Sequence, residues 1–147
     1  MEIVNINQAE IRAHAELMTE VFGQEPWNEE WDIQDAHDRL LCYKNAPLFL
    51  GLSAIDHGEL KGFVLGNFEP YQKSSHFHVK EMCVKKESQR QGVGKKLINS
   101  LHNILESKDV GSAILLTRKG SPAESFYFKC GYKLAESMGL YSREIST

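Results

Sequence analysis

The sequence predicts a mixed α/β fold of the α+β type, in which antiparallel strands precede a parallel strand-helix-strand crossover. Among its 147 residues, three segments have the composition and the turn boundaries of β-strands, at about residues 48–54, 60–68 and 77–84. A strongly periodic helical segment follows, and after it comes an entirely apolar run from Ala113 to Leu116. Because strands of a parallel sheet are covered on both faces and read as continuous apolar runs, this order indicates a mixed sheet with one parallel pair.

Periodicity and helix boundary residues define the first half of the chain. We expect a strand over residues 2–6 and a helix over residues 11–22, whose apolar residues recur every three to four positions and which Gly23 ends. A second helix is expected between Asp32, a residue type that caps helices, and Pro47, because the residue before a proline is pushed out of helical geometry. Its apolar stripe is expected to be Ile33, Ala36, Leu40 and Tyr43.

Turns and caps also delimit the second half. Residues 56–58, Asp-His-Gly, supply a hairpin turn, and the periodic helix covers about residues 93–105. Residues 121–124, Ser-Pro-Ala-Glu, predict the start of a last helix, with serine as the cap, proline at the first position and glutamate reaching back as a capping box. Gly131 is expected to end that helix. The tail over residues 132–145 alternates enough to predict one or two closing strands.

Composition and charge exclude several classes of protein. With 41% hydrophobic and 25% charged residues and neither repeats nor a linker, residues 1–147 are expected to form a single domain. A net charge of -3 argues against nucleic-acid or anionic-membrane partners. We find no signal-like or membrane-spanning run, so a cytoplasmic location is expected. Three widely spaced cysteines fit neither a disulfide framework nor a zinc motif, and His76 and His78 lack a third ligand, so no metal is expected.

A glycine-rich turn with basic residues joins the third of these strands to the periodic helix. Helix N-termini present unpaired N–H groups and partial positive charge, and Arg90, Lys95 and Lys96 add full charges, so this turn suits a pyrophosphate. It is not a P-loop, because Gln89 stands at the first glycine position, and it is not a dinucleotide fingerprint, because Leu97 stands at the third. The alternative is a tight turn with solvated lysines.

Three motifs together indicate a family. Residues 89–94, Gln-Arg-Gln-Gly-Val-Gly, resemble the coenzyme A pyrophosphate loop of the GNAT superfamily of N-acetyltransferases, which has the pattern Q-x-x-G-x-G. Upstream, residues 81–84 resemble the end of the family strand that leads into this loop. Downstream, residues 123–132 are similar to the family's closing motif, A-x-x-hydrophobic-Y-x-K-x-G-aromatic. One departure is Gly120, where family members often have asparagine.

The resemblance implies acetyl-CoA as acyl donor and a GNAT-like sheet with helices on both faces. It also implies a central parallel pair, in which the strand ending at Val84 splays from the strand ending at Thr117 to admit the pantetheine arm. The coenzyme-binding residues that the resemblance implies are Met82, Cys83, Val84, Gln89, Arg90, Gln91, Gly92, Val93, Gly94, Lys95 and Lys129. The contacts from the strand are expected to be mostly main-chain.

Acetyl transfer to an amine requires that the ammonium lose a proton and that the departing thiolate gain one. By resemblance, Tyr127 is the general acid, and its alternative role is an aromatic core residue. Glu81 is our hypothesis for the base, acting directly or through water, because alternation places it on one strand face with Cys83. The alternative for Glu81 is a salt-bridged surface group. Cys83 has no base beside it in sequence, so we do not expect it to act as a nucleophile.

The family's acceptor pocket is usually built by the first two helices and the loop between them. In that loop, Glu25 and Glu30 would attract a cationic amine, and Trp27 and Trp31 would pack on it or bind its charge. The alternative is that the carboxylates stabilise the next helix and the tryptophans fix the loop to the core.

These residues favour a primary amine on a small cationic molecule, such as a polyamine, an aminoglycoside-like sugar or an amino acid. A protein lysine or N-terminal acetyltransferase and a non-catalytic acyl-CoA-binding regulatory module stay open as alternatives. Family members are often dimers, which makes a homodimer the hypothesis for the oligomeric state.

Overall fold

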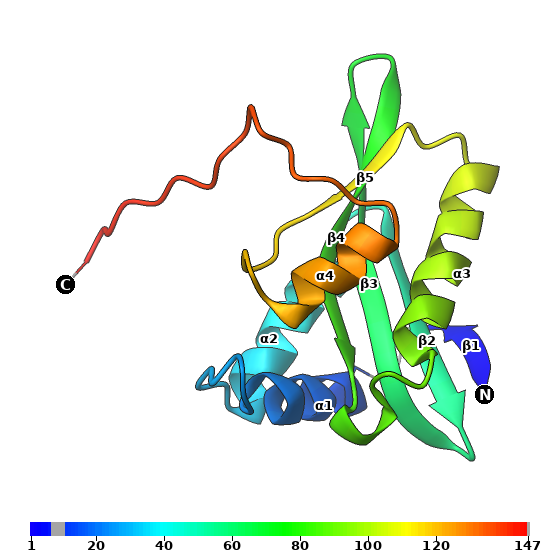
Figure 1. Ribbon diagram of the computed structural model, residues 1–147, viewed down its shortest axis with the longest axis vertical. Helices are drawn as coiled ribbons and strands as arrows, with labels where there is room; N and C mark the ends of the chain where they lie inside the picture. Colours follow the sequence, from blue (N-terminus) through cyan, green and yellow to red (C-terminus); the bar gives the residue numbers. More distant parts are fainter. Residues whose placement is uncertain (7–10, 147) are drawn as a thin grey trace. The chain divides into compact units, whose positions relative to one another are not determined.

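The computed structural model of the chain describes residues 1–6 and 11–146. They fall into two compact units, Met1–Leu116 and Thr117–Thr147. The first unit contains β1 (Glu2–Asn5), α1 (Arg12–Phe22), α2 (Ile33–Lys44), β2 (Phe49–Asp56), β3 (Glu59–Tyr71), β4 (Ser74–Val84), the short 3-10 helix η1 (Lys86–Ser88), α3 (Val93–Ser107) and β5 (Ser112–Leu115) (Figure 1). The second unit contains α4 (Pro122–Lys129).

The strands of the first unit form one five-stranded sheet in the order β1-β2-β3-β4-β5. Neighbours from β1 to β4 pair antiparallel, whereas β4 and β5 pair parallel. The connection from β4 to β5 passes through α3, as a parallel pair requires a long crossover. The predicted mixed, mostly antiparallel sheet with one parallel pair is therefore confirmed. That pair lies at one end of the strand order and not in its centre as expected, because the described residues after β5 add no further strand.

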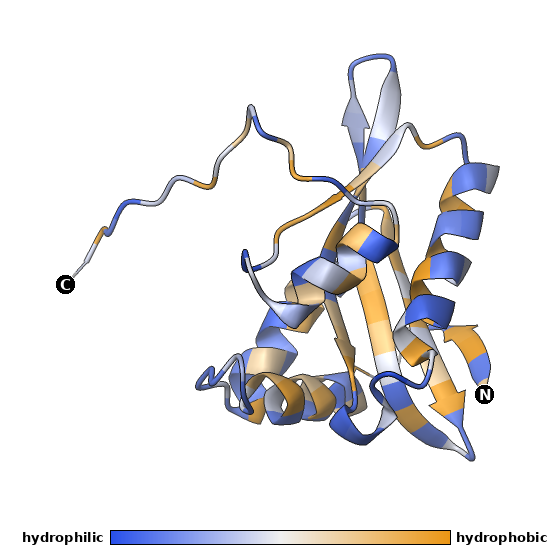
Figure 2. Cartoon of the chain, viewed as in Figure 1, coloured by the Kyte–Doolittle hydropathy of each residue, from blue (hydrophilic) through white to orange (hydrophobic). Residues whose placement is uncertain are grey.

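Alternation along β3 divides the core between the two faces of the sheet. Phe63 and Leu65 are fully buried in a cluster with apolar residues of α1 and α2. Val64 lies between them, so its side chain points to the opposite face, which α3 covers. Figure 2 shows apolar residues along β2 and β3 and on one side of α3, with polar residues on the other side of that helix. The buried residues of α3 are Val93, Leu97, Ile98, Leu101 and Leu105.

The start of α2 agrees with its predicted cap. Asp32 has an extended backbone, and its carboxylate accepts a hydrogen bond of 2.8 Å from the backbone N–H of Asp35. Ala36 and Leu40 are fully buried as predicted, but Ile33 is 36% exposed. Ile33 occupies the first position of the helix and lies outside the core cluster, so the apolar stripe begins one turn later than predicted.

The second unit begins with the predicted capping residues. Ser121 Oγ accepts a hydrogen bond of 3.1 Å from the Glu124 N–H, and the Glu124 carboxylate accepts one of 3.0 Å from the Gly120 N–H. In the part of the chain that the structure describes, no helix is both long and apolar enough to cross a bilayer.

The prediction of closing strands over residues 132–145 is wrong, because none of these residues has strand geometry. In this tail the Met138 N–H donates a hydrogen bond of 3.0 Å to the Ala135 carbonyl, which closes a local turn. Leu140 and Tyr141 are almost fully exposed. Alternating side chains do not make a strand unless a neighbouring strand accepts the backbone hydrogen bonds.

Candidate active site

The parallel pairing of β4 and β5 stops before β4 ends. The paired residues are His76–Val79 on β4 and Ser112–Leu115 on β5, whereas β4 continues to Val84. Among the described residues, no strand pairs with Lys80–Val84 on the side of β4 where β5 pairs further back, and this unpaired stretch is called the free edge of β4. The backbone N–H and C=O groups along this edge can therefore bind an extended ligand in the manner of an added strand.

A β-bulge marks the point where the two strands part. The register between β3 and β4 passes from the pair Gly66–Val79 to the pair Leu65–Glu81, so Lys80 is an extra residue. Glycine is required opposite the bulge, because a Cβ at Gly66 would lie 2.0 Å from a carbonyl oxygen of β4. The extra residue brings Lys80 and Glu81 to the same face of the sheet, where both contact α2.

The segment that follows β4 is held by its own side chains. After the turn η1, the side-chain amide of Gln89 donates a hydrogen bond of 2.9 Å to the Val84 carbonyl. The side-chain amide of Gln91 donates one of 3.0 Å to the Glu87 carbonyl. The glutamine that opens the predicted loop motif thus ties the loop to the end of β4.

The loop ends at the N-terminus of α3. Gly92 has a φ of +85°, a left-handed conformation that residues with a Cβ rarely adopt. The Lys96 N–H donates to the Gly92 carbonyl (3.0 Å), so the N–H groups of Val93, Gly94 and Lys95 precede this first helical bond. The first turn carries lysines in place of the acidic residues that stabilise a helix N-terminus. Positive side chains beside the positive end of the helix are suited to binding an anion.

Glu81, the predicted base, forms an ion pair with Arg39 of α2. Arg39 Nε lies 2.6 Å from Glu81 Oε1, and the Glu81 side chain is only 12% exposed. Burial raises the pKa of Glu81, the hydrogen bond and charge of Arg39 act in the opposite direction, and the nearby Glu29 carboxylate adds to the rise. The net direction is upward, which suits a carboxylate that must accept a proton near neutral pH.

Two aromatic rings hold the Arg39 guanidinium. Its Cζ lies 5.6 Å from the ring centroid of Trp31 and 5.4 Å from that of Tyr43. Trp31 Nε1 donates a hydrogen bond of 2.7 Å to Glu29, and Lys80 Nζ lies 5.8 Å from the Tyr43 ring. Arg39, Tyr43 and Lys80 were not among the site residues predicted from the sequence. The pairing of Arg39 with Tyr43 could have been found, because residues four positions apart share one face of α2, whereas Trp31 lies just before the helix.

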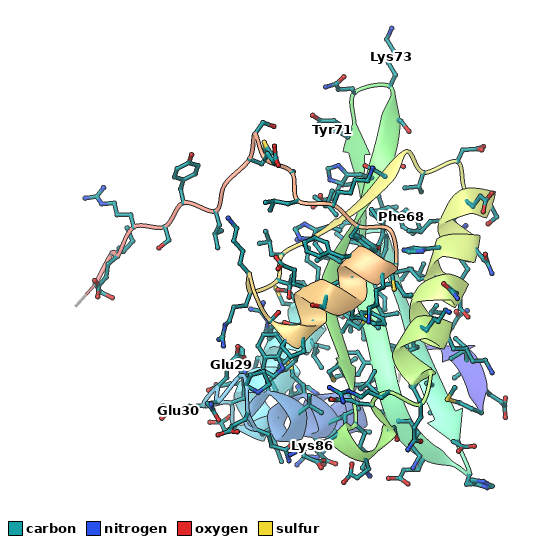
Figure 3. All side chains as sticks on the ribbon, viewed as in Figure 1. Glu29, Glu30, Phe68, Tyr71, Lys73 and Lys86 are labelled. Atoms are coloured by element: carbon teal, nitrogen blue, oxygen red, sulfur yellow. The ribbon has the colours of Figure 1, made fainter. Side chains whose placement is uncertain are left out.

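Of the residues predicted to bind the acceptor, Trp31 is the one that joins this cluster. Trp27 packs edge-to-face against Phe22 of α1, with ring centroids 5.6 Å apart, as the alternative role of fixing the loop requires. Glu25 and Glu30 are exposed, and Figure 3 shows Glu30 on the α1–α2 connection.

Cys83 is buried in the core cluster beneath α1 and α2. Burial raises the pKa of its thiol well above the usual range, and the charges of Glu81 and Glu20 add to that rise. A thiol that does not ionise is a poor nucleophile, so this residue can contribute to a bound ligand through its main chain, like Met82 and Val84 beside it.

The two strand histidines have ordinary polar partners. His76 Nε2 lies 2.6 Å from Glu69 Oε1, and Lys80 Nζ lies 3.1 Å from His78 Nδ1. Within residues 1–6 and 11–146, no group of three or more histidine, cysteine, aspartate or glutamate side chains is placed to hold a metal ion.

In the second unit, the predicted acid Tyr127 lies on α4 and is half-buried. Its ring makes edge contacts with Phe126 and Tyr132, at centroid separations of 5.3 and 5.6 Å. Burial, with a smaller contribution from Cys130, raises the pKa of Tyr132 to about 12. Lys129, in the last turn of α4, is exposed.

The free edge of β4, the glycine loop and α4 all lie within the residues that one protein-family model matches. That model, the acetyltransferase (GNAT) family, matches residues 10–132. This protein belongs to the GNAT acetyltransferase family. The match runs from before α1 to Tyr132, so it confirms the resemblance and makes the protein an acyltransferase. No curated protein sequence matches the chain.

Solved structures of other GNAT-like proteins share this fold along their whole length. A possible acetyltransferase from Clostridium difficile has 14% identity and a TM-score of 0.82, with 99% of this chain and 98% of that chain covered. A ribosomal-protein-alanine N-acetyltransferase from Brucella melitensis biovar Abortus has 17% identity and a TM-score of 0.77, covering 98% and 100%. An aminoglycoside acetyltransferase from an uncultured soil metagenomic sample, solved with sisomicin, has 16% identity and a TM-score of 0.74, covering 99% and 96%.

Proposed function

We propose that this GNAT enzyme transfers the acetyl group of acetyl-CoA directly to the primary amine of a small cationic molecule. The observation that carries the proposal is the separation of β4 from β5 immediately before a loop that ends in a lysine-bearing helix N-terminus. The two features lie on one continuous stretch, residues 80–96. The extended pantetheine arm of acetyl-CoA can bind along the free edge of β4 while the diphosphate of the same molecule reaches the N-terminus of α3.

The residues present fit a coenzyme that carries phosphate groups. Arg90 and Lys95 are exposed beside the first turn of α3, whereas Lys96 Nζ donates a hydrogen bond of 3.0 Å to the Met1 carbonyl. When bound, acetyl-CoA supplies an activated acetyl thioester. The residues that we propose to hold it are Met82, Cys83, Val84, Gln89, Arg90, Gln91, Gly92, Val93, Gly94, Lys95 and Lys129.

Glu81 is the proposed base. An amine attacks a thioester only after its ammonium has lost a proton, and the Glu81 carboxylate accepts that proton directly or through one water. Backbone N–H groups on the free edge of β4 stabilise the negative charge that develops on the acetyl oxygen. Tyr127 is the proposed acid, and its phenol gives a proton to the departing thiolate.

Exposed carboxylates and an aromatic ring on the α1–α2 connection support the proposal that the acceptor is cationic. Glu25 and Glu30 are exposed on the α1–α2 connection, and the Glu29 carboxylate orients the Trp31 ring, which already lies against a guanidinium. The name of one structural relative, an aminoglycoside acetyltransferase, agrees with an acceptor of this class. The name of another, a ribosomal-protein-alanine N-acetyltransferase, supports a peptide N-terminus as the second candidate.

The test combines binding with turnover. Calorimetry measures binding of acetyl-CoA to the purified protein, and release of free coenzyme A thiol is followed with polyamines, aminoglycosides, amino acids and short peptides. Release that depends on a cationic small molecule supports the proposal, and release that depends on peptides alone moves it to the second candidate. Binding without release from any amine favours a regulatory module, and absence of binding overturns the proposal.

The base is tested by Glu81→Gln, which keeps the shape of the side chain and removes its basicity. We expect kcat to fall by about 100-fold or more while affinity for acetyl-CoA is unchanged. Glu16→Gln is the matched control, because Glu16 forms an exposed ion pair with Arg12 (3.3 Å) on α1. Unchanged turnover in Glu81→Gln would exclude Glu81 as the base.

A further inference from the structure

The ion pair between Arg39 and Glu81 joins two segments that the family resemblance does not connect. Arg39 lies on α2, on the acceptor side, and Glu81 lies on β4 at the start of the freed edge. The hydrogen bond of 2.6 Å between Arg39 Nε and Glu81 Oε1 uses one of the two carboxylate oxygens. The second oxygen can therefore take part in proton transfer without breaking this bond.

The Arg39 side chain makes ring contacts in addition to its ion pair. Its guanidinium lies against Trp31 and Tyr43, and both rings pack against the core cluster of α1, α2 and the sheet. Tyr43 is one helical turn beyond Arg39, so the helix itself fixes the spacing between ring and guanidinium. Although the Arg39 side chain is 41% exposed, the rings fix its orientation and leave its partner carboxylate nearly buried.

We propose that Arg39 is a positioning residue for Glu81, which fixes the orientation of the carboxylate and supplies the adjacent positive charge that keeps it ionised. The charged groups around Glu81 agree with this assignment. Glu29 from the α1–α2 connection contributes negative charge, and Arg39 contributes the positive charge in direct contact. Lys80 is on the same strand, but its Nζ lies against Tyr43 and His78.

The catalytic meaning of this assignment rests on the proposed role of Glu81 as base. A base must be deprotonated before it can accept a proton, and a nearly buried carboxyl without a positive neighbour tends to stay protonated. Without Arg39, the fraction of molecules with an ionised Glu81 would fall at neutral pH. Activity would then recover only at higher pH.

The test compares Arg39→Met with Arg12→Met, an arginine in an exposed ion pair on α1. In protein labelled with ¹³C at glutamate carboxyls, the Glu81 resonance is assigned by its loss in Glu81→Gln and then titrated. We expect its midpoint to rise by about one pH unit in Arg39→Met and to stay unchanged in Arg12→Met. An unchanged midpoint in a folded Arg39→Met protein would overturn the proposal.

Arg39→Lys separates the effect of losing the positive charge from the effect of losing the guanidinium group. Lysine keeps the positive charge but not the planar group that lies against the rings, so the midpoint should rise less than in Arg39→Met. An equal rise in both variants would overturn the claim that charge is what Arg39 supplies. This variant also serves as the test if Arg39→Met does not fold.

The pH profile of kcat/KM then separates this inference from the proposed function. If Glu81 is the base, the acid limb should move to higher pH in Arg39→Met by the same amount as the carboxyl midpoint. A midpoint that moves while the acid limb stays in place would support the Arg39 assignment and reject Glu81 as the base. If no amine is acetylated, the titration still decides whether Arg39 acts on Glu81.

Discussion

We expect protonation of His14 to destabilise the folded protein in acid. It lies on α1 in the core, where its Nε2 is 2.7 Å from Ser53 Oγ and its ring contacts the edge of Phe63. Its Nδ1 is buried and has no hydrogen-bond partner among the described residues. Burial, assisted by the charge of Lys44, lowers the pKa of His14 from 6.5 to about 4. The charged imidazolium is therefore strongly disfavoured in the folded state.

The size and sign of the change in stability follow from the difference between the pKa of His14 in the unfolded chain and in the folded protein. In the unfolded chain His14 binds a proton below about pH 6.5, whereas in the folded protein it does so only near pH 4. Its contribution to stability is therefore complete above pH 6.5 and is lost as the pH falls through this window. The linkage relation gives a loss of about 2 kcal/mol at pH 5 and about 3 kcal/mol at pH 4.

The assay is urea unfolding at intervals from pH 7 to pH 4, for the wild type and for His14→Gln, which can still bond Ser53 but does not titrate. Other acid-sensitive groups are common to both proteins, so the difference between their curves isolates His14. His57→Gln is the control, because this side chain is 94% exposed in the turn between β2 and β3. Parallel curves for the wild type and His14→Gln would refute the buried, neutral assignment.

Three further substitutions test the loop, the acid and a helix cap. Gly92→Ala forces a residue with a Cβ into a φ of +85°, so we expect a stability loss of about 1–2 kcal/mol and weaker binding of acetyl-CoA by calorimetry, whereas Gly139→Ala in the tail should change neither. Tyr127→Phe should lower kcat by about 100-fold in the thiol-release assay with unchanged acetyl-CoA affinity, and full activity would assign the ring to packing alone. Asp32→Ala removes the hydrogen bond to the Asp35 N–H, so urea unfolding should show a loss of about 1 kcal/mol, and equal stability would mean that the cap does not form in solution.

Features that depend on neighbouring residues could be predicted from the sequence. The cap at Asp32, the capping residues at 121–124 and the strand-to-helix turn at Gly92 all involve residues within a few positions of one another. Local chemistry of this kind operates before any tertiary contact forms. The family motif added the order of the later elements, because its residues lie on a continuous part of the chain.

Features that depend on distant contacts could not be predicted. Arg39 and Glu81 are separated by 42 positions, and nothing in either segment indicates that the other lies beside it. The bulge at Lys80 depends on the register of β3, which no local pattern fixes. The prediction of strands in the tail was wrong because local alternation suits a strand, but a strand also needs a neighbouring strand as its partner.

The bulge in β4 places a constraint on the length of the chain. Each side chain of β4 takes its face from its pairing with β3, and Glu81 lies opposite Leu65, directly after the bulge. One residue inserted within the strand between Glu81 and Val84 would, without a second bulge, turn the residues beyond it to the opposite face of the sheet. Two inserted residues would restore those faces but move the start of the loop about 7 Å along the strand. This short part of β4 therefore accommodates exchange of residues more readily than a change in their number.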